Sequence, residues 1–193
     1  MVAMVVLVGL YSKAKRRGAR PSMPVTWTDQ EMRTFAEQLG PIGVPLEAAL
    51  AVYTAESGLD PKASSGIAWG IAQFTARTLK GLGWTRPAKE FGTLSISQQA
   101  PWVAKLVASQ ARMIGFVPKN ALELYVANFK PAAAKAGEDV LYRQGQDAYA
   151  KNINLDRDRK GFIDRHDLQV SLARAEATET YKRAIAQLAK VRS

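Results

Sequence analysis

Apolar positions recur at helical spacing in several separate stretches of the chain. Met32, Phe35 and Leu39 form one stripe, preceded by Thr28 and Glu31 in the arrangement of a capping box. Further helices are predicted over residues 45–57, 71–80, 97–113, 121–129 and 168–191. No alternating strand pattern is bounded by turn residues on both sides, so the predicted fold class is mainly α.

The helix over residues 45–57 is the best defined of these. Pro45 suits a first helical position and Gly58 suits the residue just past the end. Glu56 then lies in the last turn, where the negative end of the helix dipole disfavours an ionised carboxylate. If Leu59 and its neighbours also exclude water, burial raises the pKa of Glu56 further. A carboxylic acid that stays protonated near neutral pH can act as a general acid; the alternative is an exposed Glu at a helix end.

The length and composition of the chain indicate one main domain. Its 193 residues, 47% hydrophobic and 23% charged, suffice for one sizeable core. We expect a domain over residues 25–150, preceded by a segment over 1–24 and followed by a C-terminal part over 151–193. The last helix of that part either folds back on the domain or presents a face to another subunit. Cysteine is absent, so disulfides play no part.

The chain is strongly basic, with a formal net charge of +10. This charge favours attraction to polyanions, of which nucleic acid and the anionic bacterial envelope are two. The densest basic run, over residues 13–20, has no interleaved aromatic residues, which a platform for single-stranded nucleic acid requires. We therefore do not expect nucleic-acid binding as the primary function.

The first eleven residues form an uninterrupted apolar run that ends just before the basic cluster. As a helix this run would be about 17 Å long, against roughly 30 Å for a bilayer core, so it does not span a membrane alone. A signal peptide carries its positive charges before the apolar stretch, which is the reverse order. Three interpretations stay open: membrane or partner contact through residues 1–20, burial against another subunit, or packing on this domain.

Three segments resemble motifs of the lytic transglycosylases, which are relatives of goose-type lysozyme. Residues 56–63, Glu-Ser-Gly-Leu-Asp-Pro-Lys-Ala, are similar to the motif Glu-Ser-x-(aromatic or aliphatic)-x-Pro-x-Ala. Residues 66–74, Gly-Ile-Ala-Trp-Gly-Ile-Ala-Gln-Phe, are similar to Gly-x-x-Gly-(Leu/Ile)-x-Gln at the expected distance downstream. Residues 124–134 resemble the Tyr-x-Ala-His-Phe-x-Gly-Pro segment of domains carried by phage virions, but with Asn128 in place of His and Lys130 in place of Gly.

The resemblance covers roughly residues 44–137 and implies a lysozyme-like domain that cleaves the β-1,4 bond between N-acetylmuramic acid and N-acetylglucosamine. Glu56 would be the single catalytic residue, first as acid and then as base, and no cofactor is implied. Either the sugar's own C6 hydroxyl or water would complete the reaction, giving a 1,6-anhydro product or hydrolysis. Tyr125 would also orient Glu56. The implied substrate-binding residues are Ser57, Gln73, Phe74, Tyr125 and Asn128.

The same resemblance indicates a setting. The implied partners are peptidoglycan glycan strands and other subunits of a virion or an envelope complex. Because the third motif resembles the virion version and no export signal is visible, we expect a phage virion, with the bacterial periplasm or envelope as the alternative. The function would then be local cell-wall penetration during host entry. A competing hypothesis is a structural virion or envelope component with a lysozyme-like fold and little or no activity.

Residues 156–167 follow an EF-hand calcium loop in several positions. Lys160 occupies a ligand position, where its ammonium repels a cation, and Asp167 is shorter than the glutamate usual at the last position. We therefore predict no metal, with Lys160 as an internal counter-charge; a calcium loop is the alternative. His166 is the only histidine, which excludes a Ser/His/Asp triad and a His-rich zinc site. The carboxylates that calcium would use are Asp156, Asp158, Asp164 and Asp167.

Overall fold

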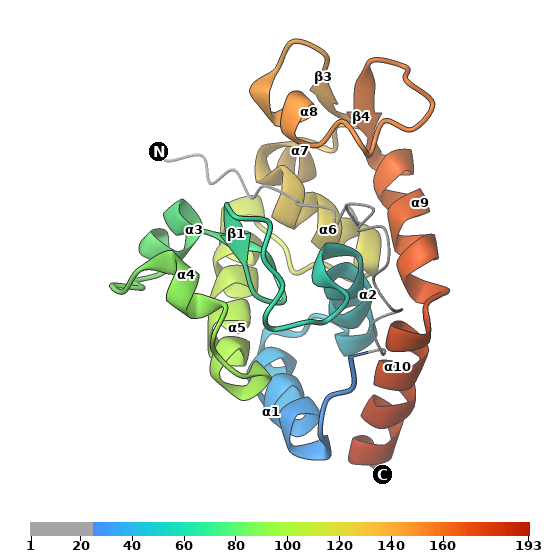
Figure 1. The fold of residues 1–193 in the computed structure, drawn as a ribbon. Helices are drawn as coiled ribbons and strands as arrows, with labels where there is room; N and C mark the ends of the chain where they lie inside the picture. Colours follow the sequence, from blue (N-terminus) through green and yellow to red (C-terminus); the bar gives the residue numbers. More distant parts are fainter. Residues whose placement is uncertain (1–24) are drawn as a thin grey trace, which may run out of the picture.

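The computed structural model describes residues 25–193, so the interpretations of residues 1–24 lie outside the described residues. Helices dominate this part of the chain (Figure 1), which confirms the predicted mainly α class. The first elements are α1 (Asp29–Leu39), the short 3-10 helix η1 (Gly40–Ile42) and α2 (Leu46–Ser57). The capping box at Thr28 and the end of α2 at Gly58 form as predicted.

Eight further helices and four short strands follow in the described part of the chain, residues 25–193. The helices are α3 (Ala76–Gly81), α4 (Ala88–Phe91), α5 (Ile96–Ile114), α6 (Ala121–Phe129), α7 (Pro131–Ala136), α8 (Asp147–Lys151), α9 (Arg165–Glu176) and α10 (Glu179–Arg192). The strands are β1 (Ala68–Trp69), β2 (Phe74–Thr75), β3 (Val140–Arg143) and β4 (Phe162–Asp164). They form two antiparallel pairs, β1 with β2 and β3 with β4.

Helix α2 is the central element of the core. Leu50, Val52 and Tyr53 are all fully buried although they point in different directions around the helix. A helix that is buried on every side must be covered by other elements. Helices α6, α9 and α10 pack against it, and Figure 1 shows the segment from α2 to α3 beside its C-terminal end. The C-terminal end of α2 is therefore enclosed by protein.

The helix predicted over residues 71–80 is shorter in the structure, because α3 begins only at Ala76. Gly70 and Gln73 have φ angles of +77° and +45°, in the left-handed region that a right-handed helix excludes. The Gln73 N–H instead donates to the Gly70 carbonyl at 3.1 Å and closes the turn between β1 and β2. The prediction that Gln73 lies on a helix is therefore wrong.

The C-terminal helical stretch is divided in two at Thr178. The Thr178 side chain accepts a hydrogen bond from the Tyr181 N–H at 3.2 Å and so begins α10 as a new helix. Helix α10 folds back on α1 and α2, where Lys190 Nζ lies 2.6 Å from Asp29 and Arg192 pairs with Glu47. Of the two interpretations of this helix, packing on the domain is the one observed.

The pairing of β3 with β4 crosses the domain boundary predicted between residues 150 and 151. Val140 pairs with Asp164, and Tyr142 with Ile163. The C-terminal part is thus joined to the main domain through a shared sheet. Within residues 25–193, no helix combines the length and apolar character needed to cross a membrane.

Candidate active site

Glu56 lies in the last turn of α2 with its side chain inside the protein. Gly58, in the left-handed conformation with φ +66°, ends the helix and donates its N–H to the Thr54 carbonyl at 2.9 Å. Glu56 is only 1% exposed, and neither carboxylate oxygen has a hydrogen-bond partner. Burial raises the pKa of this carboxyl well above its usual value. The predicted burial of Glu56 is confirmed.

Three further buried polar side chains lie near Glu56, and together with it we call them the Glu56 cluster: Tyr53, Glu56, Tyr125 and Asn128. Tyr53 lies one turn before Glu56 on α2, while Tyr125 and Asn128 lie one turn apart on α6. The hydroxyls of Tyr53 and Tyr125 and Oδ1 of Asn128 also lack hydrogen-bond partners. With the two Glu56 oxygens, five buried oxygens in one place are unpaired.

The side chains of the Glu56 cluster influence one another's pKa values. Burial raises the pKa of Tyr125, and the negative charge of Glu56 raises it further. Burial and the Glu56 charge also raise the pKa of Tyr53, while the nearby Asn128 side chain favours its ionised form. Asn128 lies close to the Tyr53 hydroxyl without completing a well-formed hydrogen bond. Tyr125, which the resemblance implies would orient Glu56, forms no hydrogen bond with it in the structure.

Unpaired polar groups in a protein interior are rare because each costs about 1–3 kcal/mol. A group of five fits a site that receives polar groups from outside, such as water or a sugar. Sequence reasoning placed Tyr125 and Asn128 here but did not include Tyr53 among the site residues. The available signal was its position three residues before Glu56, which puts the two side chains on one helical face.

Ser57 and Phe74 have internal contacts in the structure. The Ser57 hydroxyl donates to the Ile71 carbonyl at 2.8 Å and to the Tyr53 carbonyl at 3.0 Å, which ties the second motif to the end of α2. Phe74 is fully buried, with its ring centroid 4.8 Å from that of Phe91. Both side chains thus hold the site in place, and their predicted contacts with substrate stay a prediction.

Gln73 is buried in the turn between β1 and β2. Its Nε2 donates to the Gly70 carbonyl at 2.9 Å and to the Ala63 carbonyl at 3.4 Å. The side chain therefore connects the two motifs on either side of Ser65, and its φ of +45° is a strained conformation for a residue other than glycine. Its predicted contact with substrate also stays a prediction.

Sequence reasoning missed Gln99, which fastens this turn to α5. Its Oε1 accepts from the Ile71 N–H at 3.0 Å, and its Nε2 donates to the Pro61 carbonyl at 2.7 Å and the Leu94 carbonyl at 3.1 Å. A Cβ atom on Gly70 would overlap Gln99 Oε1, which explains the glycine. The signal in the sequence was a polar residue on the apolar stripe of α5.

Residues 156–167, which we call the Lys160 loop, place a lysine among the carboxylates. Lys160 Nζ lies 2.9 Å from Asp164 Oδ2 and 3.1 Å from Asp167 Oδ2. Asp156 accepts hydrogen bonds from the Tyr149 hydroxyl at 2.6 Å and from the Lys160 N–H at 2.9 Å. Burial alone would lower the pKa of Lys160, but its hydrogen bonds to the two aspartates raise it. Lys160 is thus the predicted counter-charge.

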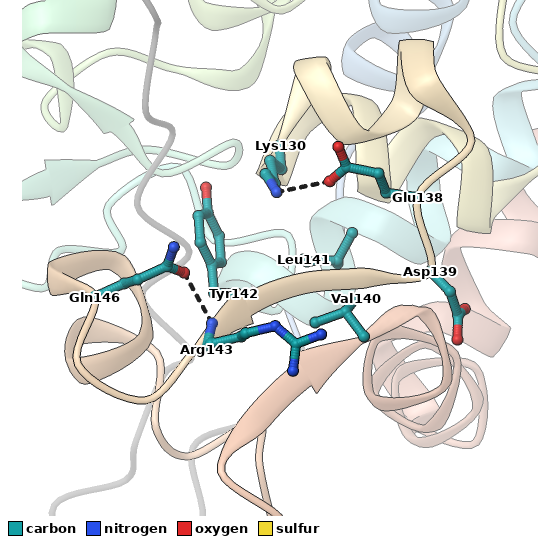
Figure 2. A pocket seen from close by; sticks show the side chains of 8 residues that line it. All are labelled: Lys130, Glu138, Asp139, Val140, Leu141, Tyr142, Arg143 and Gln146. Carbon is teal, nitrogen blue, oxygen red and sulfur yellow. Dashed lines mark hydrogen bonds and ion pairs between the residues drawn. The ribbon is translucent and has the colours of Figure 1, made fainter.

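No group of three or more histidine, aspartate or glutamate side chains within residues 25–193 is arranged to hold a metal ion. An open cavity of about 470 Å³ lies along β3 (Figure 2). Lys130 lines it, pairs with Glu138 at 2.9 Å and has its ammonium 5.6 Å from the centre of the Tyr142 ring. No member of the Glu56 cluster lines this cavity, so it is separate from the candidate active site.

Comparison with known proteins found no match. This holds for family models, for curated proteins and for solved structures. The resemblance to the lytic transglycosylases therefore rests on the residues of the three motifs.

Proposed function

We propose that this chain is a peptidoglycan lytic transglycosylase with a lysozyme-like fold and Glu56 as its single catalytic residue. The observation that carries this proposal is the buried, unpaired Glu56 carboxyl among other unpaired polar groups. It lies where the three motif segments meet. Ser57 joins the first motif to the second through Ile71, and Tyr125 and Asn128 bring the third beside Glu56.

The chemistry follows from the raised pKa of Glu56. The protonated carboxyl donates its proton to the glycosidic oxygen while the bond from that oxygen to C1 of N-acetylmuramic acid breaks. The 2-acetamido carbonyl of the same sugar assists the departure. The C6 hydroxyl then attacks C1 and gives its proton to the Glu56 carboxylate, which restores the acid. The products are a 1,6-anhydromuramyl end and a free N-acetylglucosamine hydroxyl; water in place of the C6 hydroxyl gives hydrolysis.

The direct test is lysis of purified peptidoglycan by the full chain. Glu56→Gln keeps the size of the side chain and removes the transferable proton, so we expect clearing in turbidity and zymogram assays to fall by about 10²–10⁴-fold. Glu37→Gln is the matched control, because Glu37 is exposed on α1. Mass spectrometry of the released fragments then separates anhydro ends from reducing ends. Equal clearing by wild type and Glu56→Gln contradicts the proposal.

The expected setting is a virion that penetrates the cell wall of its host, with a bacterial envelope complex as the alternative. This part of the proposal rests on the resemblance of the third motif. A virion location predicts that the protein copurifies with intact particles and that antibodies detect it there. Detection only in the envelope of uninfected cells contradicts the virion setting and leaves the proposed reaction intact.

The complete burial of Glu56 favours a second candidate function, a structural component of a virion or envelope complex. The Glu56 oxygens are enclosed, and Ser57 and Phe74 make internal contacts. A structural role predicts no clearing by the wild type, and normal assembly and infectivity of particles that carry Glu56→Gln. Loss of infectivity in those particles, with normal assembly, contradicts it.

A further inference from the structure

The proposed mechanism makes no use of Tyr53, although its hydroxyl is one of the unpaired groups of the Glu56 cluster. The Tyr53 ring is fixed in the core, with its centroid 6.3 Å from that of Phe35 in an edge-to-face arrangement. The hydroxyl is buried and has no hydrogen-bond partner. Two other tyrosines differ in this respect. The Tyr142 hydroxyl donates to the Phe129 carbonyl at 3.0 Å, and that of Tyr149 to Asp156.

An unpaired buried hydroxyl makes no net contribution to folding. Moving a hydroxyl from water to an apolar interior without a hydrogen bond is unfavourable, and phenylalanine would fill the same space without that cost. The Tyr53 hydroxyl therefore calls for an explanation other than stability. Its position supplies one, because Tyr53 and Glu56 are three residues apart on the same face of α2.

The surroundings of this pair are simple. Helix α6 brings Asn128 to the Tyr53 hydroxyl and Tyr125 close to Glu56. Burial raises the pKa of Glu56, and Tyr53, Tyr125 and Asn128 are the buried polar side chains that lie beside it. The groups that can respond to ionisation of Glu56 are thus the two tyrosine hydroxyls and the Asn128 amide.

We propose that Tyr53 is a positioning residue for Glu56: its hydroxyl, oriented by Asn128, donates a hydrogen bond to the Glu56 carboxylate once the proton has left. A hydroxyl that donates to a carboxylate favours its ionised form. The catalytic consequence of this contact rests on the proposed function, but the contact itself does not. The contact forms when Glu56 carries a negative charge inside the protein.

The test compares Tyr53→Phe with Tyr142→Phe in the full chain, since each removes one tyrosine hydroxyl, unpaired in Tyr53 and hydrogen-bonded in Tyr142. The carbonyl stretch of protonated Glu56 in infrared difference spectra, assigned with Glu56→Gln, gives the pH at which half of this carboxyl is ionised. Tyr53→Phe moves that pH upward, and Tyr142→Phe leaves it unchanged. Tyr53→Phe also unfolds at the same temperature as the wild type or a higher one, whereas Tyr142→Phe unfolds at a lower one.

Activity measurements distinguish a positioning role of Tyr53 from a purely structural one. Tyr53→Phe lowers kcat about tenfold with KM unchanged, and the basic limb of the activity profile moves to higher pH because Glu56 stays protonated longer. An unchanged half-ionisation pH, or a lower unfolding temperature for Tyr53→Phe, overturns the proposal. Inactivity of the wild type defeats the proposed function instead, and the infrared measurement still decides the role of Tyr53.

Discussion

The Glu56 cluster holds one buried carboxyl and the Lys160 loop holds several largely buried ones, and the surroundings of these carboxyls are opposite in the two regions. In the cluster the two Glu56 oxygens have no partner, and neither do the hydroxyls beside them. In the loop Lys160 contacts Asp164 at 2.9 Å and Asp167 at 3.1 Å, and Asp156 accepts hydrogen bonds from Tyr149 and from the backbone.

This difference indicates what each region contributes. Charges that are paired and hydrogen-bonded hold a loop in one conformation, and removal of one partner leaves the others buried and uncompensated. An unpaired buried acid lowers stability, and groups of that kind concentrate at sites of binding and catalysis. The loop is therefore a structural feature and the cluster a functional candidate.

One carboxyl from each region, Glu56 and Asp164, illustrates opposite responses to pH. The pKa of Glu56 is raised by burial, so stability is full below the unfolded value of 4.5 and declines as the pH rises above it. For Asp164, burial raises the pKa, but the hydrogen bonds from Lys160 and from the Asp167 N–H, together with the positive charge of Lys160, outweigh it, and the net shift is downward. The stability from Asp164 is therefore present above the unfolded value of 3.8 and lost as the pH falls below it.

The largest expected effect is on the paired region. Within residues 25–193, Lys160 is the cation that contacts Asp164 and Asp167, so Lys160→Met leaves both carboxylates largely buried without a counter-charge. We expect the free energy of unfolding, measured by urea denaturation, to fall by about 3–4 kcal/mol. The control is Lys182→Met, whose exposed pair with Glu179 should be worth less than about 1 kcal/mol. Similar losses in both variants contradict a special role for Lys160.

Gln99→Leu should have the next largest effect, since Gln99 is a buried, fully paired group that fastens the turn between β1 and β2 to α5. Leucine fills a similar space but leaves the Ile71 N–H and the Pro61 carbonyl without a partner. We expect a loss of about 2–3 kcal/mol in the free energy of unfolding. Gln38→Leu, at an exposed position on α1, is the control and should change it by less than about 0.5 kcal/mol. Equal stability of the two variants would show that the Gln99 hydrogen bonds are dispensable.

Glu56→Gln should change stability in the opposite sense. At pH 7 the wild type must either ionise a buried carboxyl or hold a proton that the unfolded chain releases, and glutamine avoids both. We expect a gain of about 2 kcal/mol at pH 7 that shrinks as the pH falls toward 4.5. Thermal unfolding at several pH values measures it, with Glu37→Gln as the control. A loss of stability at pH 7 would mean that Glu56 is paired in solution.

The sequence predicted helices wherever apolar spacing and a capping residue agree, as at Thr28 and Gly58. It mispredicted the start of α3, because the apolar residues after Gly70 resemble a helical stripe while the backbone there takes left-handed angles. A tertiary contact decides this turn. The Gln99 side chain accepts a hydrogen bond from the Ile71 N–H, and the sequence around residue 71 does not indicate this long-range contact.

For the site, motif residues were enough to locate Glu56, Tyr125 and Asn128 together. They did not distinguish side chains that point into the cluster from side chains that support it, such as Ser57 and Phe74. The direction in which a side chain points depends on how α2 and α6 pack against each other. Residue spacing along one helix does not specify that packing. Tyr53 was missed for the same reason, because the direction in which its hydroxyl points cannot be read from the spacing of apolar residues along α2.

The smallest expected effect concerns calcium. In the wild type the Lys160 ammonium lies among the carboxylates that calcium would use, and a divalent cation there would meet a like charge. Excess calcium or a chelator should therefore leave the unfolding temperature of the wild type unchanged. Lys160→Asn replaces the ammonium with a neutral oxygen ligand at the same loop position, so calcium should raise the unfolding temperature of this variant alone. An equal increase in both proteins would show that calcium binds despite Lys160, and the loop would then be a metal site.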